Sequence, residues 1–186
     1  MQTIKNIIVE LISAVVCGLV IGLLMAITAS AFVQAATFAN DYRSNLSWME
    51  FNLGESTYSF SSVVSLLLAA ALIAWIKKWL NIQHWAGPAD SIYAAHSENA
   101  VIDTRKGIGS TAAAFIVISS GGSVGQYGPL VHFGSTIGLF LKKYFTLRMH
   151  PDILIGCGVA AAISAGFNAP LAGVIFAHEA ILRHFS

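Results

Sequence analysis

Long apolar runs, separated by shorter polar or glycine-rich stretches, organise this chain. They cover residues 7–39, 63–80, 101–120, 129–144 and 151–183. The first run would form a helix of roughly 50 Å, whereas the hydrocarbon core of a bilayer is about 30 Å thick. Such a helix must tilt or project from the membrane. We predict an all-α membrane protein with tilted and broken transmembrane helices, in a single membrane domain of residues 1–186.

Several of these runs are too short or too interrupted to cross a bilayer as one straight helix. Residues 129–144 would give roughly 24 Å of helix, less than a full span of about 30 Å. The last run is interrupted at Phe167-Asn168-Ala169-Pro170, and Gly87-Pro88 opens a possible short helix. Short hydrophobic segments broken by glycine or proline are the best indication in a sequence of a transporter's substrate site.

Small residues recur at four-residue spacing in two of the runs. The first stripe contains Gly18, Gly22, Ala26 and Ser30, and the second contains Gly158, Ala162 and Gly166. Small side chains let membrane helices approach closely. The stripes therefore predict that the chain self-associates or pairs with a homologous half.

The segment from Ser119 to Gly134 places five glycines and a proline within apolar sequence. Backbone groups freed at such a break must face protein or a water-filled cavity, because lipid offers them no partners. Proline suits the first turn of a helix, so we expect a helix to start at Pro129. The N–H groups at a helix start are unsatisfied and carry partial positive charge. The segment therefore predicts an anion site formed by backbone amides.

Composition agrees with a membrane protein. Hydrophobic residues make up 56% of the chain and charged residues 10%, against roughly 25% charged in a soluble domain. The net charge of +1 argues against nucleic acid as a partner. Cys17 and Cys157 lie in apolar runs and are interpreted as small packing residues. We expect no metal site and no cofactor.

The distribution of basic residues predicts an orientation. Lys5 and Lys77-Lys78 flank the first two runs on one side, whereas the loop between those runs holds Arg43 among acidic residues. Cytoplasmic loops carry an excess of lysine and arginine. We therefore expect a multi-pass integral membrane protein with a cytoplasmic N-terminus, in the bacterial inner membrane or another plasma membrane.

Two sequence blocks resemble the CLC family of chloride channels and chloride–proton antiporters. Residues 125–134 read GQYGPLVHFG, similar to the family's GREGP motif and its PLVHxG continuation. Residues 160–179 read AAAISAGFNAPLAGVIFAHE, similar to the family's AAAFNAPLAGxLFxxEE segment. The resemblance covers about residues 7–182, which correspond to the N-terminal one of the family's two inverted repeats. It implies transport of chloride or another small monovalent anion, no enzymatic activity, and a homodimer or a complementary CLC half as partner.

The resemblance also implies an anion site made from two short motifs. Its residues are Gly125, Gln126, Tyr127, Gly128 and Pro129, together with Gly87 and Pro88. Tyr127 stands at the gate position, where the family has a proton-carrying glutamate. Trp85 falls near the position of the family's anion-binding serine. The inner proton-transfer position corresponds to Glu179 or Ala180, with alanine at the matching place. Because neither a phenol nor a methyl group exchanges protons near neutral pH, the resemblance implies passive transport that is not coupled to protons.

Some alternatives stay open. His132 is expected to be a packed, hydrogen-bonded residue, and His178 could either relay protons or reach the membrane interface. Gly121-Gly-Ser-Val-Gly125 fits the G-x-S-x-G nucleophile elbow, so an intramembrane serine hydrolase is a remote alternative; that elbow needs a strand before its serine. The chain could also be a non-transporting truncated half, or a packing subunit that needs a second CLC repeat.

Overall fold

The computed structural model describes residues 2–45, 50–53, 56–97, 101–145 and 149–183, of which residues 2–7, 10, 44, 50–53, 56–59 and 144–145 are described by their backbone only. The Lys5 side chain, used above for orientation, therefore lies outside the described residues. In chain order the elements are α1 (Gln2–Asn45), β1 (Glu50–Leu53), β2 (Ser56–Ser59), α2 (Phe60–Trp79), α3 (Pro88–Ala95), α4 (Thr104–Ser119), α5 (Tyr127–Phe145), α6 (Pro151–Phe167), α7 (Pro170–Phe176) and the π-helix η1 (Ala177–Leu182).

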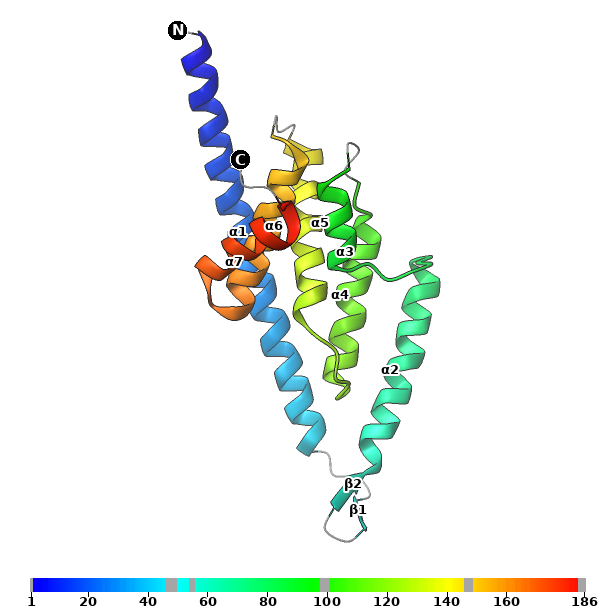
Figure 1. Ribbon diagram of the computed structural model, residues 1–186. Helices are drawn as coiled ribbons and strands as arrows, with labels where there is room; N and C mark the ends of the chain where they lie inside the picture. The colour runs from blue at the N-terminus through cyan, green and yellow to red at the C-terminus, as the bar shows by residue number, and fades with distance from the viewer. Residues whose placement is uncertain (1, 46–49, 54–55, 98–100, 146–148, 184–186) are drawn as a thin grey trace.

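Two long helices stand on either side of the molecule. Figure 1 shows α1 along one side and α2 along the other, joined by the antiparallel hairpin of β1 and β2, with α4 and α5 between them. Both are long and apolar enough to cross a membrane, and only 11% and 6% of their most apolar stretches are buried. Exposed leucines such as Leu19, Leu23 and Leu67 cover them. The prediction of a helical membrane fold is confirmed, with one short hairpin added in the loop between the first two spans.

One face of α1 packs on the rest of the chain, and the first small-residue stripe lies on another. The buried residues of α1 recur every three or four positions: Cys17, Ile21, Met25, Ala29, Phe32 and Ala36. All of them except Ala36 belong to two core clusters that also contain residues of α4, α5 and α6. A Cβ atom added at Gly18 or Gly22 would meet nothing within 4 Å. The first stripe is therefore open on the surface of this chain.

The second stripe is used inside the chain, where α5 and α6 cross. A Cβ atom at Gly158 would collide with the carbonyl oxygen of Gly134, and one at Gly138 would collide with that of Leu154. Small residues let two membrane helices bring their backbones this close. The second stripe thus pairs α6 with α5, which fixes the position of α5, and is not free to bind another chain.

Local chemistry sets helix starts that differ slightly from the expected ones. Asp103 caps α4, since its Oδ1 accepts the N–H of Arg105 at 2.9 Å, and the helix begins at Thr104. Helix α5 begins at Tyr127, two residues before Pro129. Proline is tolerated in a first turn, because its missing N–H would have no partner there.

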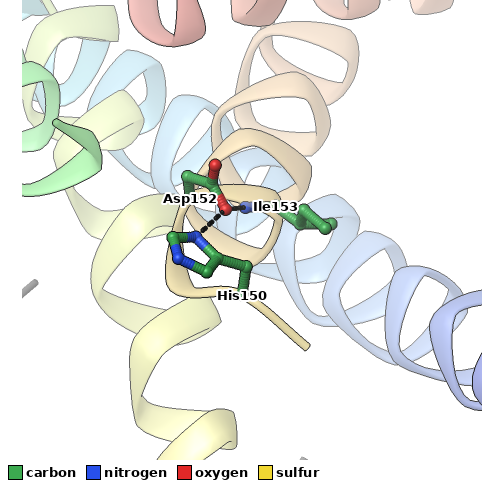
Figure 2. Close-up of polar contacts among 3 residues, drawn as sticks. All are labelled: His150, Asp152 and Ile153. Carbon is green, nitrogen blue, oxygen red and sulfur yellow. Dashed lines mark hydrogen bonds and ion pairs between the residues drawn. The ribbon is translucent and has the colours of Figure 1, made fainter. Parts of the chain in front are cut away.

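The last apolar run breaks where its sequence indicated. Asn168 adopts the left-handed conformation (φ 53°) and caps α6, and the N–H of Ala169 donates to Ser164. Pro170 then begins α7. At the other end of α6, the Asp152 carboxylate accepts the N–H of Ile153 at 2.7 Å and lies 2.6 Å from Nδ1 of His150 (Figure 2). A carboxylate at a helix start stabilises it.

Candidate anion site

The starts of α3 and α5 lie side by side, although their sequences are about forty residues apart. A Cβ atom at Gly128 would lie 3.7 Å from Cγ and Cδ of Pro88. Gly128 belongs to the first turn of α5, and Pro88 is the first residue of α3. The structure thus brings together the two short motifs that the sequence analysis assigned to one site.

The start of α5 presents unpaired donors. By helix geometry the N–H groups of Tyr127 and Gly128 have no partner within the helix, and Pro129 carries no N–H. These amides carry the positive end of the helix dipole. The residues before them, Gly122 to Gly125, run as an irregular loop. The first turn of α5 can therefore donate two backbone hydrogen bonds to an anion.

The start of α3 is different, because its own carboxylate already occupies it. The N–H of Gly87 donates to Oδ2 of Asp90 at 2.8 Å, and Pro88 has no N–H to offer. An acidic side chain in the first turn also satisfies the helix dipole locally. By the same helix geometry, the first turn of α3 leaves only the N–H of Ala89, whereas that of α5 leaves two N–H groups.

A cavity of about 250 Å³ lies beside the loop that leads into α5. We call it the Ser110 cavity; its lining includes Trp85, Ser110, Gly125 and Pro129. Oγ of Ser110 accepts the N–H of Ala86 at 2.9 Å. A serine hydroxyl that accepts one hydrogen bond can still donate its own hydrogen. In the Ser110 cavity, the hydroxyl of Ser110 can therefore act as a donor close to Gly125 and Pro129, which line the same cavity.

Sequence reasoning missed Ser110. Its only signal was a polar residue among small ones in an apolar run, Gly107-Ile-Gly-Ser-Thr111, and many serines in membrane helices have that surrounding. Ser110 is 6% exposed. Its hydrogen bond with Ala86 forms because α4 packs beside the turn before α3, which the sequence does not reveal. Trp85, which the resemblance places near the family's serine position, lines the same cavity.

Tyr127, at the predicted gate position, packs against the end of α6. Its ring stacks on Phe167 with centroids 3.9 Å apart and an interplanar angle of 26°. A Cβ atom at Gly166 would lie 2.8 Å from the same ring, so the ring rests on the backbone of α6. Aromatic pairs contribute about 0.5–1.5 kcal/mol beyond burial. The start of α5 is thus pinned to the end of α6.

His132 is packed and hydrogen-bonded, as expected. It is 1% exposed, and its Nδ1 lies 3.0 Å from Oγ of the fully buried Ser91. This contact links α5 to α3. Among the described residues, Nε2 of His132 has no hydrogen-bond partner.

The remaining candidates lie outside this cluster. Glu179 and Ala180 fall in η1 with His178, and the side chains of His178 and Glu179 are exposed. Helix α4, not a strand, precedes Ser123. The strand–turn–helix geometry of a nucleophile elbow is therefore not formed there, and the structure gives the hydrolase alternative no support.

The fold and the site define a class: a helical membrane protein with broken helices, one of which starts beside a mostly apolar cavity that contains the Ser110 hydroxyl. The family described as "Voltage gated chloride channel" matches this chain over residues 68–186. The chain belongs to this family, and the resemblance noted in its sequence is confirmed.

Individual relatives agree with this assignment. A ClcB-like chloride channel protein of Ralstonia nicotianae is 30% identical over 120 residues, which are 62% of this chain and 27% of that protein. The voltage-gated ClC-type chloride channel ClcB of Salmonella typhimurium is 26% identical over 163 residues, 86% of this chain and 39% of ClcB. Chloride channel protein A of Dictyostelium discoideum is 28% identical over 181 residues, 86% of this chain and 20% of that protein. The chain thus spans between a fifth and two fifths of these relatives.

Proposed function

We propose that this chain binds chloride, or another small monovalent anion, at the start of α5 and takes part in its passive movement across a membrane. The observation that carries the proposal is the first turn of α5, where Tyr127 and Gly128 have N–H groups without a partner in the helix. Gly125 and Pro129, on either side of these two residues, line the Ser110 cavity. Family membership supports chloride as the anion.

The chemistry of this site suits an ion that must both enter and leave. Backbone amides and one hydroxyl replace part of the ion's hydration shell without a full opposing charge. Conduction requires binding that is favourable enough for entry and weak enough for release. The lining of the Ser110 cavity contains no charged side chain among the described residues, so no fixed cation holds the ion there.

The lack of a carboxylate at the gate position supports passive transport. Tyr127 carries a phenol where the family has a carboxylate, and the methyl side chain of Ala180 cannot bind a proton. Proton coupling would need a group at each position that loads and unloads protons in each cycle. We infer that Tyr127 acts instead as a steric restriction on the anion path.

We propose that this chain pairs with a homologous half to form the transporting unit. The chain spans only 20–39% of the relatives named above, and the stripe at Gly18 and Gly22 is open. The partner would be a second copy or a complementary CLC half. Chemical crosslinking in bilayers should give dimers, whereas monomers at every protein density would contradict pairing. Without a partner, the chain would be a non-transporting half or packing subunit.

We further propose that the N-terminus is cytoplasmic and that the host is a bacterial inner membrane or another plasma membrane. Lys77 and Lys78, in the last turn of α2, lie at the end expected to face the cytoplasm. Accessibility of a tag at the N-terminus in intact cells tests this, because a tag labelled from outside contradicts it.

Chloride titration by calorimetry tests the binding site directly. Gly128→Val should weaken chloride binding, because the added methyl groups would crowd Pro88 and cover the N–H groups of the first turn. Gly18→Val is a matched control, since its Cβ atom would meet nothing within 4 Å, and it should bind chloride like the native chain. Equal affinities in all three proteins would contradict the proposed site.

A further inference from the structure

A second cavity lies on the α1 side of the loop that leads into α5. Its volume is about 260 Å³, and its polar lining includes Thr37, Asn40 and Gln126 with the backbone of Gly121 and Gly122. We call it the Gln126 cavity. No acidic side chain of the described residues lines it. Gln126 is the residue directly before α5, and its neighbour Gly125 lines the Ser110 cavity, so the two cavities flank one loop.

Arg43 lies behind one wall of the Gln126 cavity, and the hydrogen bonds described for its guanidinium go to neutral side chains. Nη1 of Arg43 donates to Oγ of Ser62 at 2.9 Å, and Nη2 donates to Oδ1 of Asn40 at 3.0 Å. The Nε atom of Arg43 is buried with no hydrogen-bond partner among the described residues. A partly buried charge normally pairs with an opposite charge, because desolvation is otherwise costly. The two described hydrogen bonds go to neutral groups, so they do not neutralise the positive charge of Arg43.

The loop is shaped around this guanidinium. Gly121 has φ +88°, a conformation that favours glycine. A Cβ atom there would lie 2.8 Å from Cζ of Arg43. The backbone of the loop therefore lies directly on the guanidinium, and Gly121 forms part of the wall of the Gln126 cavity. The positive charge is separated from the cavity by only a thin layer of backbone and the Asn40 side chain.

Asn40 adds directed donors to that charge. Arginine only donates hydrogen bonds, so the oxygen of the Asn40 amide faces Arg43 and the NH₂ group is left for another partner. Asn40 and Gln126 both line the cavity. The cavity therefore suits an anion better than a cation. It has a positive charge behind its wall and two amide side chains in its lining, and no carboxylate is among the described lining residues.

We propose that the Gln126 cavity is a second, distinct binding site for a small monovalent anion. Arg43 provides the positive charge of this site, and the site supplies anions to the start of α5. The proposal rests on the proposed function, because it gives the site a role in the same anion path. Charge of one sign in a cleft raises the local concentration of the opposite ion. Sequence reasoning took Arg43 only as a loop residue beside acidic ones, since its contacts with Ser62 and Gly121 cross long stretches of chain.

Anomalous diffraction from crystals of the full chain soaked in sodium bromide tests this site by position. We expect a bromide peak in the Gln126 cavity, close to Asn40 and Gln126, in the native protein. It should persist in Arg105→Gln, which removes an exposed charge at the opposite end of α4, and vanish in Arg43→Gln. A native cavity without bromide, or a peak that survives Arg43→Gln, would overturn the proposal. Bromide at the start of α5 reports separately on the proposed function.

Two further variants cover the case in which Arg43→Gln does not fold. Asn40→Asp keeps an acceptor for Nη2 of Arg43 but places a negative charge in the cavity wall, so the bromide peak should disappear. Arg43→Lys keeps the charge and should keep the peak. Bromide titration at low ionic strength should show roughly tenfold weaker binding in Asn40→Asp, and the difference should shrink as salt is added. Native-like bromide binding in Asn40→Asp contradicts the proposal.

Discussion

One methyl group added at Gly134 should destabilise the protein, and the same change at Gly22 should not. A Cβ atom at Gly134 would collide with the carbonyl oxygen of Gly158, an obstacle made of backbone that cannot rotate away. Overpacking of this kind costs about 1–3 kcal/mol, and the rigid obstacle places it near the upper value. Alanine regains about 1 kcal/mol of helix propensity over glycine. The net loss for Gly134→Ala is therefore about 2 kcal/mol.

Gly22→Ala is the matched control, because it is the same substitution within a long helix but meets nothing within 4 Å. It should gain up to about 1 kcal/mol from propensity alone. Denaturation of both variants in detergent, followed by circular dichroism, should separate their unfolding free energies by about 3 kcal/mol. Equal stabilities would mean that α5 and α6 do not cross as closely as described. These values apply to the single chain; a loss at Gly22 that grows with protein concentration is the result expected if the proposed partner packs on that stripe.

Three further predictions concern the site. Ser110→Ala should weaken chloride binding about tenfold to a hundredfold in calorimetry, since a hydrogen bond to a charged group contributes about 1.5–3 kcal/mol. Unchanged affinity would show that Ser110 is not part of the site. Tyr127→Ala should raise anion flux in liposomes, because it removes the ring that restricts the path. Tyr127→Phe keeps the ring on Phe167, so its flux should equal that of the native chain. A lower flux in Tyr127→Ala would contradict a steric restriction. Ser91→Ala should lower the unfolding free energy by about 1–3 kcal/mol, because it leaves the buried His132 without its partner; unchanged stability would show that this contact contributes little.

The helices and their breaks follow from local sequence rules. Apolar runs predict helices in a membrane because every backbone group must pair within its own segment. The break at Asn168 and Pro170 is readable, because one residue favours the left-handed cap and the other starts a helix. The start of α5 at Tyr127 was missed by two residues, since a first turn accepts proline at any of its positions.

Contacts between segments far apart in the chain could not be predicted from the sequence. The two stripes of small residues look alike in the sequence. Yet a Cβ atom added at Gly158 would collide with the backbone of Gly134, whereas one added at Gly22 would have no atom within 4 Å. Only the packing of α5 on α6 distinguishes them. The acidic residue at the start of α3 was a signal that went unused, because Asp90 at the third position predicts a capping bond to the Gly87 N–H. The GPxD pattern therefore argued in advance against Gly87 as a free donor.

The roles of Ser110 and Arg43 depend on tertiary structure alone. Each is a single polar residue in or beside an apolar run, and nothing in its neighbourhood specifies a partner. Ser110 bonds Ala86 across 24 positions, and Arg43 bonds Ser62 across 19. The motif at residues 125–129 indicated where an anion could bind, but the surrounding donors come from helices whose placement the motif does not encode.

Anion flux from liposomes, measured together with proton movement, tests the central claim most directly. The chain is reconstituted with a chloride gradient, a pH-sensitive dye inside and a potassium ionophore to clamp the voltage. We predict chloride release that is faster than from empty liposomes and faster again in Tyr127→Ala, with no change in internal pH. Proton uptake driven by the chloride gradient at clamped voltage would contradict passive transport, and chloride release no faster than from empty liposomes would contradict transport by this chain.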